Sequence, residues 1–383
     1  MMREAGHEAA IFTRSYPLNQ AAPLERFFPA EIQRDRYTVS LKGLRTVKEI
    51  LYSSSAVKGL RSLLREFRPD VVHAHNIYGG LSTSVLDALK ASGTPVVMTL
   101  HDLKLLCPSY LMLNHGRVCE RCKGKRFYNA ILTRCHKDSS IASAIYAVES
   151  YLSHLSRKYN SVECFIAPSM FLLNKHREFG FDPEKFVHIP NPIDATGLTA
   201  RGETGGYLFY FGRLSREKGI RTLISAYGKV KTDVPLHIAG EGAEREAAED
   251  MAAHQRGGQI RFLGYLKASP LGKAIDLARA VILPSECYEN APMAILESFI
   301  RGKPVIGARI GGIPEMIDDG VNGYLFEPGN PEDLKRKIEV ILGLNGDRLM
   351  EMGRAARSKV EREYSARSHY ERLMQAYGKA LGA

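Results

Sequence analysis

Two glutamates, Glu289 and Glu297, lie eight positions apart in a stretch that could bring both carboxylates to one ligand site. The apolar run 280–283 predicts a buried parallel strand, Pro284 ends it, and Pro292 fits the first turn of a helix. Glu289 then lies in the strand-to-helix loop, and Glu297 lies about one turn into the helix. Ligands of open α/β sheets bind beyond the carboxyl ends of the strands, so both carboxylates are expected to face a ligand. For any isolated pair of glutamates, a loop charge and a solvated helix charge are the alternative.

A possible anion cradle follows the strand predicted at 207–211. Gly212 permits a tight turn, Arg213 offers a planar fork suited to phosphate oxygens, and Lys218 offers a compact positive charge. The helix that begins after Gly219 adds free backbone N–H groups and the positive end of its dipole. The pattern predicts a diphosphate site, with a basic surface loop as the alternative.

Four cysteines fall within 29 residues, at the spacing C-x11-C-x2-C-x12-C: Cys107, Cys119, Cys122 and Cys135. The central pair could chelate one edge of a Zn²⁺ ion, and the flanking pair could complete a tetrahedral shell. The Gly- and Lys-rich stretch 123–126 has little core of its own, so a metal would supply its order. We expect a structural zinc here; four reduced thiols and an iron–sulfur cluster are the alternatives.

A series of motifs runs in order over most of residues 70–365. They are Val97-Met-Thr-Leu-His101-Asp102, Ala167-Pro-Ser169, Ile189-Pro-Asn191-Pro-Ile-Asp194, Gly212-Arg213 with Glu217-Lys218-Gly219, Ile238-Ala-Gly240-Glu-Gly242, Phe262-Leu-Gly264, the Glu289 and Glu297 pair, Gly302-Lys-Pro-Val-Ile, and Gly311-Gly312-Ile-Pro-Glu315 with Gly320-Val-Asn-Gly323. Each motif is weak alone, but the ordered set closely resembles the family-4 retaining glycosyltransferases of the GT-B fold.

The resemblance implies an α/β architecture of the GT-B type, with two Rossmann-like, doubly wound domains facing each other across a cleft. We expect an acceptor-side domain over 1–192, carrying a Cys-rich insert at 107–137, and a nucleotide-sugar-binding domain over 205–364. The segment 365–383 is expected to form a helix that crosses back to the first domain.

The resemblance also implies an activity, the transfer of a sugar from a UDP- or GDP-type nucleotide sugar to a glycan or lipid-linked acceptor, with retention of configuration. Cell-surface polysaccharide synthesis is the expected setting. The expected catalytic residues are His101, Glu289, Arg213 and Lys218. The two cations would stabilise the charge that grows on the leaving diphosphate, without a catalytic cofactor, and His101 would face the sugar.

The remaining expected positions bind the substrate. Glu297 would accept hydrogen bonds from the ribose hydroxyls. The amides of Asn290, Ala291 and Pro292 would hold the sugar, and those near Gly311 and Gly312 would face the diphosphate. The close-approach glycines of the donor site complete the set: Gly212, Gly240 and Gly264.

The elements that must position these residues alternate between strands and helical patterns, which predicts parallel, doubly wound sheets. Strands are expected at 8–13, 70–73, 95–99, 163–167 and 187–189, and then at 207–211, 235–239, 260–263, 280–283, 304–306 and 324–326. The segment 193–206 is expected to be the interdomain linker.

One expected element has no place in the sequence. Residues 3–7 resemble the last turn of a helix that Gly6 stops, yet a doubly wound domain should have a strand, followed by a glycine-rich loop, before that helix. Either the natural chain begins upstream of Met1 or the domain is remodelled, and we favour the first. The activity of this polypeptide by itself is then in doubt.

Composition narrows the class of protein. A chain of 383 residues is expected to form two domains. It has no transmembrane run and no signal-peptide core, so a cytoplasmic location, with the inner face of the plasma membrane as a further expectation, fits best. The net charge of +11 is concentrated in residues 1–190, which hold 26 Lys and Arg against 17 Asp and Glu. That half is expected to face an anionic surface or acceptor.

A membrane-surface helix is a further expectation, with helix 54–68 as its main candidate. Leu60, Leu63, Leu64 and Phe67 share one face, and basic residues line an adjoining one. An ordinary helix with its apolar stripe on a sheet is favoured over this interpretation. The basic upstream helix 41–52 adds modestly to the membrane case.

Rival functions remain open at this point. A GT-B sugar-nucleotide epimerase or hydrolase would use a similar nucleotide site for another reaction. A catalytically impaired nucleotide-sugar-binding protein would fit the lack of the first glycine-rich turn. Nucleic-acid binding is not expected, because the sequence has a positive net charge but no recognised DNA-binding helix or ribbon motif.

Overall fold

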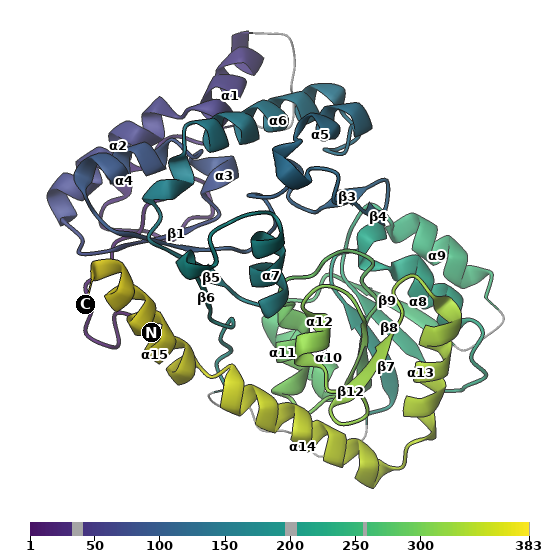
Figure 1. The fold of residues 1–383 in the computed structure, drawn as a ribbon. Helices are drawn as coiled ribbons and strands as arrows, with labels where there is room; N and C mark the ends of the chain where they lie inside the picture. Colours follow the sequence, from purple (N-terminus) through teal and green to yellow (C-terminus); the bar gives the residue numbers. More distant parts are fainter. Residues whose placement is uncertain (33–40, 196–204, 256–258, 383) are drawn as a thin grey trace.

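The computed structural model describes residues 1–32, 41–195, 205–255 and 259–382. Two parallel sheets, each with helices on its faces, lie in separate lobes of the molecule (Figure 1). The central part of the linker expected at 193–206 lies outside the described residues.

The first sheet has the strand order β1-β2-β5-β6, and its neighbours pair in parallel. Its strands are β1 (Val72–His75), β2 (Val96–Thr99), β5 (Cys164–Ala167) and β6 (Phe186–His188). Buried side chains from these strands and the covering helices form one core. The helices of this lobe are α1 (Leu41–Leu51), α2 (Ser54–Phe67), α3 (Ile77–Gly80), α4 (Val85–Ser92), α5 (Tyr128–Thr133), α6 (Ser140–Leu155) and α7 (Met170–Glu178).

The insert between β2 and α6 contains a short antiparallel hairpin, β3 (Leu113–Asn114) with β4 (Arg117–Val118). Side-chain caps set several helix starts in this lobe. Ser53 accepts a hydrogen bond from the backbone of α2, Ser139 from that of α6, and Ser169 from that of α7.

The second sheet has six parallel strands in the order β12-β11-β10-β7-β8-β9. Its strands are β7 (Tyr207–Phe211), β8 (Leu236–Ala239), β9 (Ile260–Gly264), β10 (Ala278–Leu283), β11 (Val305–Ala308) and β12 (Gly323–Phe326). Apolar clusters cover both faces, as a parallel sheet requires. The helices are α8 (Ile220–Tyr227), α9 (Arg245–Ala253), α10 (Ala268–Asp276), α11 (Met293–Phe299), α12 (Ile313–Met316), α13 (Pro331–Gly343) and α14 (Gly346–Glu363).

The last helix, α15 (Ala366–Leu381), leaves the second lobe and lies against the first sheet (Figure 1). Leu373 and Ala376 are buried there against Val97, Cys164 and Ile166 of β2 and β5. The two lobes are therefore tied together at the C-terminal end as well as through the segment that joins the sheets.

The strand expected at 8–13 is wrong. Residues 7–16 have no regular secondary structure, and the side chain of Ile11 is 59% exposed. Phe12 packs toward Gly59 of α2, and the following Arg14 reaches α3, so this segment lies against helices. Its backbone finds no ladder of strand partners, which a strand needs. The other expected strands form, with ends shifted by up to two residues.

The turn expected at residues 3–7 does form. Gly6 has a left-handed φ of 87°, and its N–H donates to the carbonyl of Arg3 while that of His7 donates to Met2. This bond pair is the Schellman ending of a helical turn.

The membrane role expected for the helix at 54–68 is not supported by the packing of α2. Five of its apolar side chains are buried against the first lobe: Ala56, Val57, Leu60, Leu63 and Leu64. An apolar stripe that is already covered cannot enter a lipid surface. Within the described ranges, no helix is both long and apolar enough to span a bilayer.

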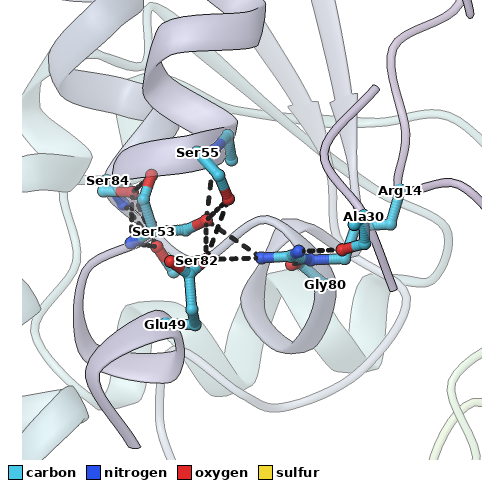
Figure 2. A network of polar contacts seen from close by, with 9 residues as sticks. Arg14, Ala30, Glu49, Ser53, Ser55, Gly80, Ser82 and Ser84 are labelled. Atoms are coloured by element: carbon cyan, nitrogen blue, oxygen red, sulfur yellow. Dashed lines mark hydrogen bonds and ion pairs between the residues drawn. The ribbon is translucent and has the colours of Figure 1, made fainter. Parts of the chain in front are cut away.

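A buried arginine fixes the N-terminal segment to this lobe (Figure 2). Arg14 is 2% exposed, and its guanidinium donates to the carbonyls of Gly80 and Ala30, to Ser53 Oγ at 2.9 Å and to Glu49 Oε2 at 3.0 Å. The Glu49 carboxylate also accepts from two serine hydroxyls at the start of α2. One ion pair and its hydrogen bonds thus join the first segment, α1, α2 and α3.

This network should make the stability of the protein fall in acid. Burial works to raise the pKa of the Glu49 carboxyl, but its hydrogen bonds to the serines and to Arg14 outweigh burial, so the pKa is lowered from its ordinary value of 4.5. A lowered folded-state pKa stabilises the protein above the unfolded value, and that stability is lost as pH falls through the folded value. We expect the melting temperature of wild type to exceed that of Glu49→Gln at neutral pH and to converge on it below pH 4.5. The exposed Glu8→Gln is the control; a difference that stays constant with pH would contradict the expectation.

Candidate functional site

The carboxyl ends of strands from both sheets meet around a cavity of about 130 Å³. The first lobe supplies the residues after β2 and the start of α7, and the second supplies those after β7 and β10. Five expected site residues line the cavity: His101, Arg213, Lys218, Glu289 and Asn290. Residues brought together from four separate stretches of chain therefore share one small space.

The central contact of this site is an ion pair. Lys218 Nζ lies 2.5 Å from Glu289 Oε1, and Ser285 Oγ donates to the same oxygen at 2.6 Å. Lys218 ends a short 3-10 turn, and the next residue, Gly219, has a left-handed φ of 70°. A Cβ on Gly219 would lie 1.8 Å from the Pro284 carbonyl oxygen, so only glycine lets the two loops approach. The glycine thus places the ammonium beside the glutamate loop.

Arg213 is the more exposed of the two expected cations. Its side chain is 60% exposed, and Nη2 lies 3.1 Å from Glu217 Oε1. Ser215 Oγ donates to that oxygen at 2.7 Å, which orients Glu217. The backbone of Arg213 is fixed by a hydrogen bond, since the buried Tyr210 hydroxyl donates to its carbonyl at 2.9 Å. A fixed backbone with an exposed guanidinium suits a group that must reach a bound anion.

His101 faces this pair from the first lobe. It follows β2 and forms a 2.9 Å hydrogen bond between its Nε2 and Nδ1 of His75. Burial lowers the pKa of His101 below 6.5, and burial with a charge on His101 lowers that of His75 to about 4. Both imidazoles are therefore neutral near pH 7, so His101 can contact an uncharged sugar without carrying a charge into the cleft.

Two contacts between the lobes were not expected from the sequence. Asn290 Nδ2 donates to the Leu100 carbonyl at 3.1 Å and its Oδ1 accepts from Ser169 Oγ at 2.7 Å. The Glu315 carboxylate accepts from the first two N–H groups of α7, that of Met170 at 2.7 Å and that of Phe171. Burial raises the pKa of Glu315, against those two hydrogen bonds. Asn290 lies between the paired glutamates, and Glu315 ends the motif that begins at Gly311. The family resemblance carried by these motifs was the sequence signal that could have pointed to both residues.

Two expected amide roles are corrected by the backbone. The N–H of Gly312 donates to the Glu289 carbonyl at 2.8 Å, so in this structure the amide supports the glutamate loop. A Cβ on Gly311 would lie 2.2 Å from that same carbonyl oxygen, so both glycines serve close packing of two loops. Pro292 carries no N–H and can offer a sugar only its carbonyl.

The other expected positions lie around the cavity and not in its lining. Glu297 lies on α11 and is half-buried, and burial raises its pKa above 4.5. Gly212, Gly240 and Gly264 follow β7 and β8 and end β9, where Gly240 donates to the Gly264 carbonyl at 2.8 Å. A Cβ on Gly240 would lie 1.9 Å from the carbonyl oxygen of Gly212. These glycines keep the carboxyl edge of the sheet closely packed beside the site.

The cysteines of the insert are free thiols. Cys107 lies 3.2 Å from Ser109 Oγ, and a hydrogen bond from the Cys122 thiol lowers the pKa of Cys107. In the part of the chain that the structure describes, no three or more His, Cys, Asp or Glu side chains are arranged to hold a metal ion. A zinc shell of Cys107, Cys119, Cys122 and Cys135 stays a prediction from their spacing.

A second, larger cavity of about 580 Å³ adjoins the insert. Arg117 and Arg121 line it from the first lobe, and Arg216 lines it from the second. Glu120, in the same lining, accepts from the Tyr288 hydroxyl at 2.8 Å, and Tyr288 in turn lines the smaller cavity. The insert therefore borders the candidate site, and three guanidinium groups, two from the insert and one from the second lobe, lie next to it.

Comparison with known proteins agrees with this arrangement. The sequence model of a family described as Glycosyltransferase Family 4 matches residues 1–196, and a second, described as Glycosyl transferases group 1, matches residues 199–359. A glycogen synthase of Mycobacterium tuberculosis is 28% identical over 287 residues, which cover 73% of this chain and 61% of that protein. The sulfoquinovosyl transferase SQD2 of Arabidopsis thaliana is 26% identical over 79% of this chain and 55% of its own length. The chain thus spans less than two thirds of either relative.

Solved structures share the fold. Sucrose-phosphate synthase from Thermosynechococcus elongatus aligns with a TM-score of 0.69 and 18% identity, over 97% of this chain and 88% of its own. The Anabaena protein Alr3699/HepE, in a structure that contains UDP, aligns with a TM-score of 0.61 and 18% identity, over 84% of this chain and 81% of its own. At such identities, the likeness establishes the two-lobed architecture and nothing about substrates.

Proposed function

The chain belongs to glycosyltransferase family 4, and from that premise we propose that it transfers a sugar from a nucleoside diphosphate sugar to an acceptor hydroxyl with retention of configuration. The observation that carries the proposal is the Lys218–Glu289 pair, which shares a cavity with Arg213 and with His101 of the opposite lobe. Two cations and a carboxylate beside a neutral imidazole suit a ligand with an anionic end and a hydroxyl-rich end.

The reaction needs charge stabilisation more than it needs an acid or a base. As the bond between the sugar and the diphosphate breaks, the bonding electrons move to the phosphate oxygen, and negative charge grows there. Lys218, held by Glu289, and Arg213, held by Glu217, would stabilise that charge with little reorganisation. The acceptor hydroxyl would attack from the same face, and the leaving phosphate would take its proton.

The donor would lie mainly on the second lobe. The Glu297 carboxylate would accept hydrogen bonds from the ribose hydroxyls, and Glu289 would hold sugar hydroxyls beside His101. A UDP- or GDP-type donor fits the proposal; the Alr3699/HepE structures, which contain UDP or UDP-glucose, favour uridine as the first base to test.

The acceptor would enter from the first lobe. Arg117, Arg121 and Arg216 give the adjoining cavity a positive lining, which favours an acceptor that carries negative charge, such as a lipid-linked glycan diphosphate. Surface polysaccharide assembly is the setting that we propose for such an acceptor. A sugar-nucleotide hydrolase or epimerase is the second candidate, and conversion of the donor without any acceptor would favour it.

Replacement of Glu297 tests the donor site. We expect Glu297→Ala to weaken the binding of UDP or GDP by about tenfold or more, because hydrogen bonds to a charged group contribute roughly 1.5–3 kcal/mol each. Isothermal titration calorimetry measures the change. Glu339→Ala, which removes a partly exposed glutamate from α13, is the matched control and should bind like wild type. An affinity unchanged in Glu297→Ala would argue against the ribose role.

A further inference from the structure

The outer face of α6 is apolar along its whole length. Ile141, Val148, Leu152 and Leu155 are 53%, 43%, 43% and 78% exposed, and the partly buried Ile145 lies between the first two. These positions are spaced by four, three, four and three residues, so they form one continuous stripe. The opposite face of the helix is buried in the first lobe. A surface helix of a soluble domain normally has the reverse pattern.

The apolar surface continues onto the neighbouring α5, which packs against α6 (Figure 1). Tyr128, Ile131 and Leu132 on α5 are 48%, 37% and 73% exposed. Two helices with seven exposed large apolar side chains make a broad patch, and patches of this kind mark a contact with a partner or a lipid surface. We call these seven residues the α5–α6 patch.

The charge around this patch is mainly positive. Residues 121–158 contain eight Lys and Arg and two Asp and Glu. Of the two acids, Glu149 is buried against Lys104, whereas Asp138 is exposed next to Lys137. Exposed basic side chains flank both helices: Arg126 before α5, Arg134 and Lys137 between the helices, and Arg157 after α6.

We propose that the α5–α6 patch docks this protein on a bilayer that contains anionic lipid. Apolar side chains would enter the boundary between headgroups and acyl chains, and the basic rim would pair with lipid phosphates. The aromatic Tyr128 suits the depth at which tyrosines gather in membranes. A second copy of this chain fits the patch less well, because it would bring one basic rim against another.

Buried contacts connect the patch to the cleft. Lys104 lies three residues after His101 and pairs with Glu149 of α6 at 2.7 Å, and His154 of α6 contacts the Leu105 carbonyl at 3.1 Å. A bilayer under α5 and α6 would therefore hold the first lobe in a fixed position relative to lipid. The docking surface stands apart from the proposed reaction, because lipid binding can be measured without turnover.

The test is sedimentation of the full chain with vesicles of phosphatidylcholine, alone or mixed with phosphatidylglycerol. Wild type is expected to bind the mixed vesicles, to bind the neutral ones far less, and to release at high salt. Leu152→Glu should weaken binding by about tenfold or more, because it places a charge in the apolar stripe. Val340→Glu is the matched control, since Val340 is also 43% exposed on a helix, in the other lobe.

The basic rim is tested separately. Arg134→Gln with Lys137→Gln should weaken binding by about fivefold for each charge removed, and the exposed Lys231→Gln should have no effect. Equal losses in Leu152→Glu and Val340→Glu, or equal binding of wild type to neutral and mixed vesicles, would overturn the proposal. So would a wild-type dimer that Leu152→Glu dissociates, seen by sedimentation velocity without vesicle binding, because the patch would then be an interface between copies.

Discussion

Lys218→Ala should lower the turnover number by about 10²–10³, the loss seen when one preorganised donor to a developing negative charge is removed. The ammonium is held 2.5 Å from Glu289 by a loop that only glycine at position 219 permits. Its position is thus fixed before the donor binds, and no reorganisation is needed as charge grows on the diphosphate. Removing it also leaves Glu289 as an uncompensated negative charge beside the leaving group.

Steady-state kinetics with a saturating acceptor measure this effect. Arg213→Ala should also lower turnover, because its guanidinium would stabilise the same negative charge that develops on the diphosphate. The Arg213 side chain is, however, more exposed than that of Lys218. Lys229→Ala is the control, because this lysine of the same lobe is 45% exposed and pairs with Glu332 on the surface. Turnover equal to that of wild type in both Lys218→Ala and Arg213→Ala would refute the cradle.

The parallel sheets were predictable because their signal is local. Runs such as 207–211 are apolar throughout, as strands covered on both faces must be, and turn residues mark their ends. The residues of the proposed cradle, Gly212, Arg213, Lys218 and Gly219, could be singled out for the same reason, because they are nearly adjacent in the chain. The segment 8–13 has the pattern of a strand but does not form one, because such a pattern forms a strand only where a ladder partner exists.

The contacts between the lobes could not be derived from local patterns. The backbone amide of Asn290 was expected to hold a sugar. Its side chain instead forms hydrogen bonds to the Leu100 carbonyl and the Ser169 hydroxyl of the other lobe. Glu315 stabilises the N-terminus of α7 from the other lobe, a helix-dipole contact between residues about 145 positions apart. Such pairs depend on how two domains are placed, and only the three-dimensional arrangement supplies that.

The distribution of exposed apolar residues was likewise hidden from the sequence. The helices α2 and α6 both carry apolar stripes, but only the fold determines which stripe faces a sheet. In α2 the stripe is buried, and in α6 it faces outward while a different set of residues fills the core. The favoured interpretation of helix 54–68, an ordinary helix with its apolar stripe in the core, therefore agrees with the packing of α2.

A buried ion pair links this outer helix to the loop that carries His101. Lys104 and Glu149 are 4% and 2% exposed, and their charged atoms lie 2.7 Å apart. Lys104 Nζ also donates to the Pro108 carbonyl at 3.3 Å, and Ser153 Oγ donates to Glu149 at 3.1 Å. Burying two charges costs several kcal/mol per ion, which mutual attraction and these hydrogen bonds must offset.

Lys104→Ala should destabilise the protein by about 3–5 kcal/mol, because it leaves the Glu149 carboxylate buried without its cation. The double variant Lys104→Met with Glu149→Leu should recover most of that loss, since apolar groups of similar volume remove both charges together. Chemical denaturation followed by circular dichroism measures both changes, and Lys229→Ala should change the unfolding free energy by less than about 1 kcal/mol. The comparison separates two roles for the pair. A double variant as unstable as Lys104→Ala would mean that the hydrogen bonds around Lys104 hold the loop, whereas recovery of stability together with lower turnover would mean that the charges position His101.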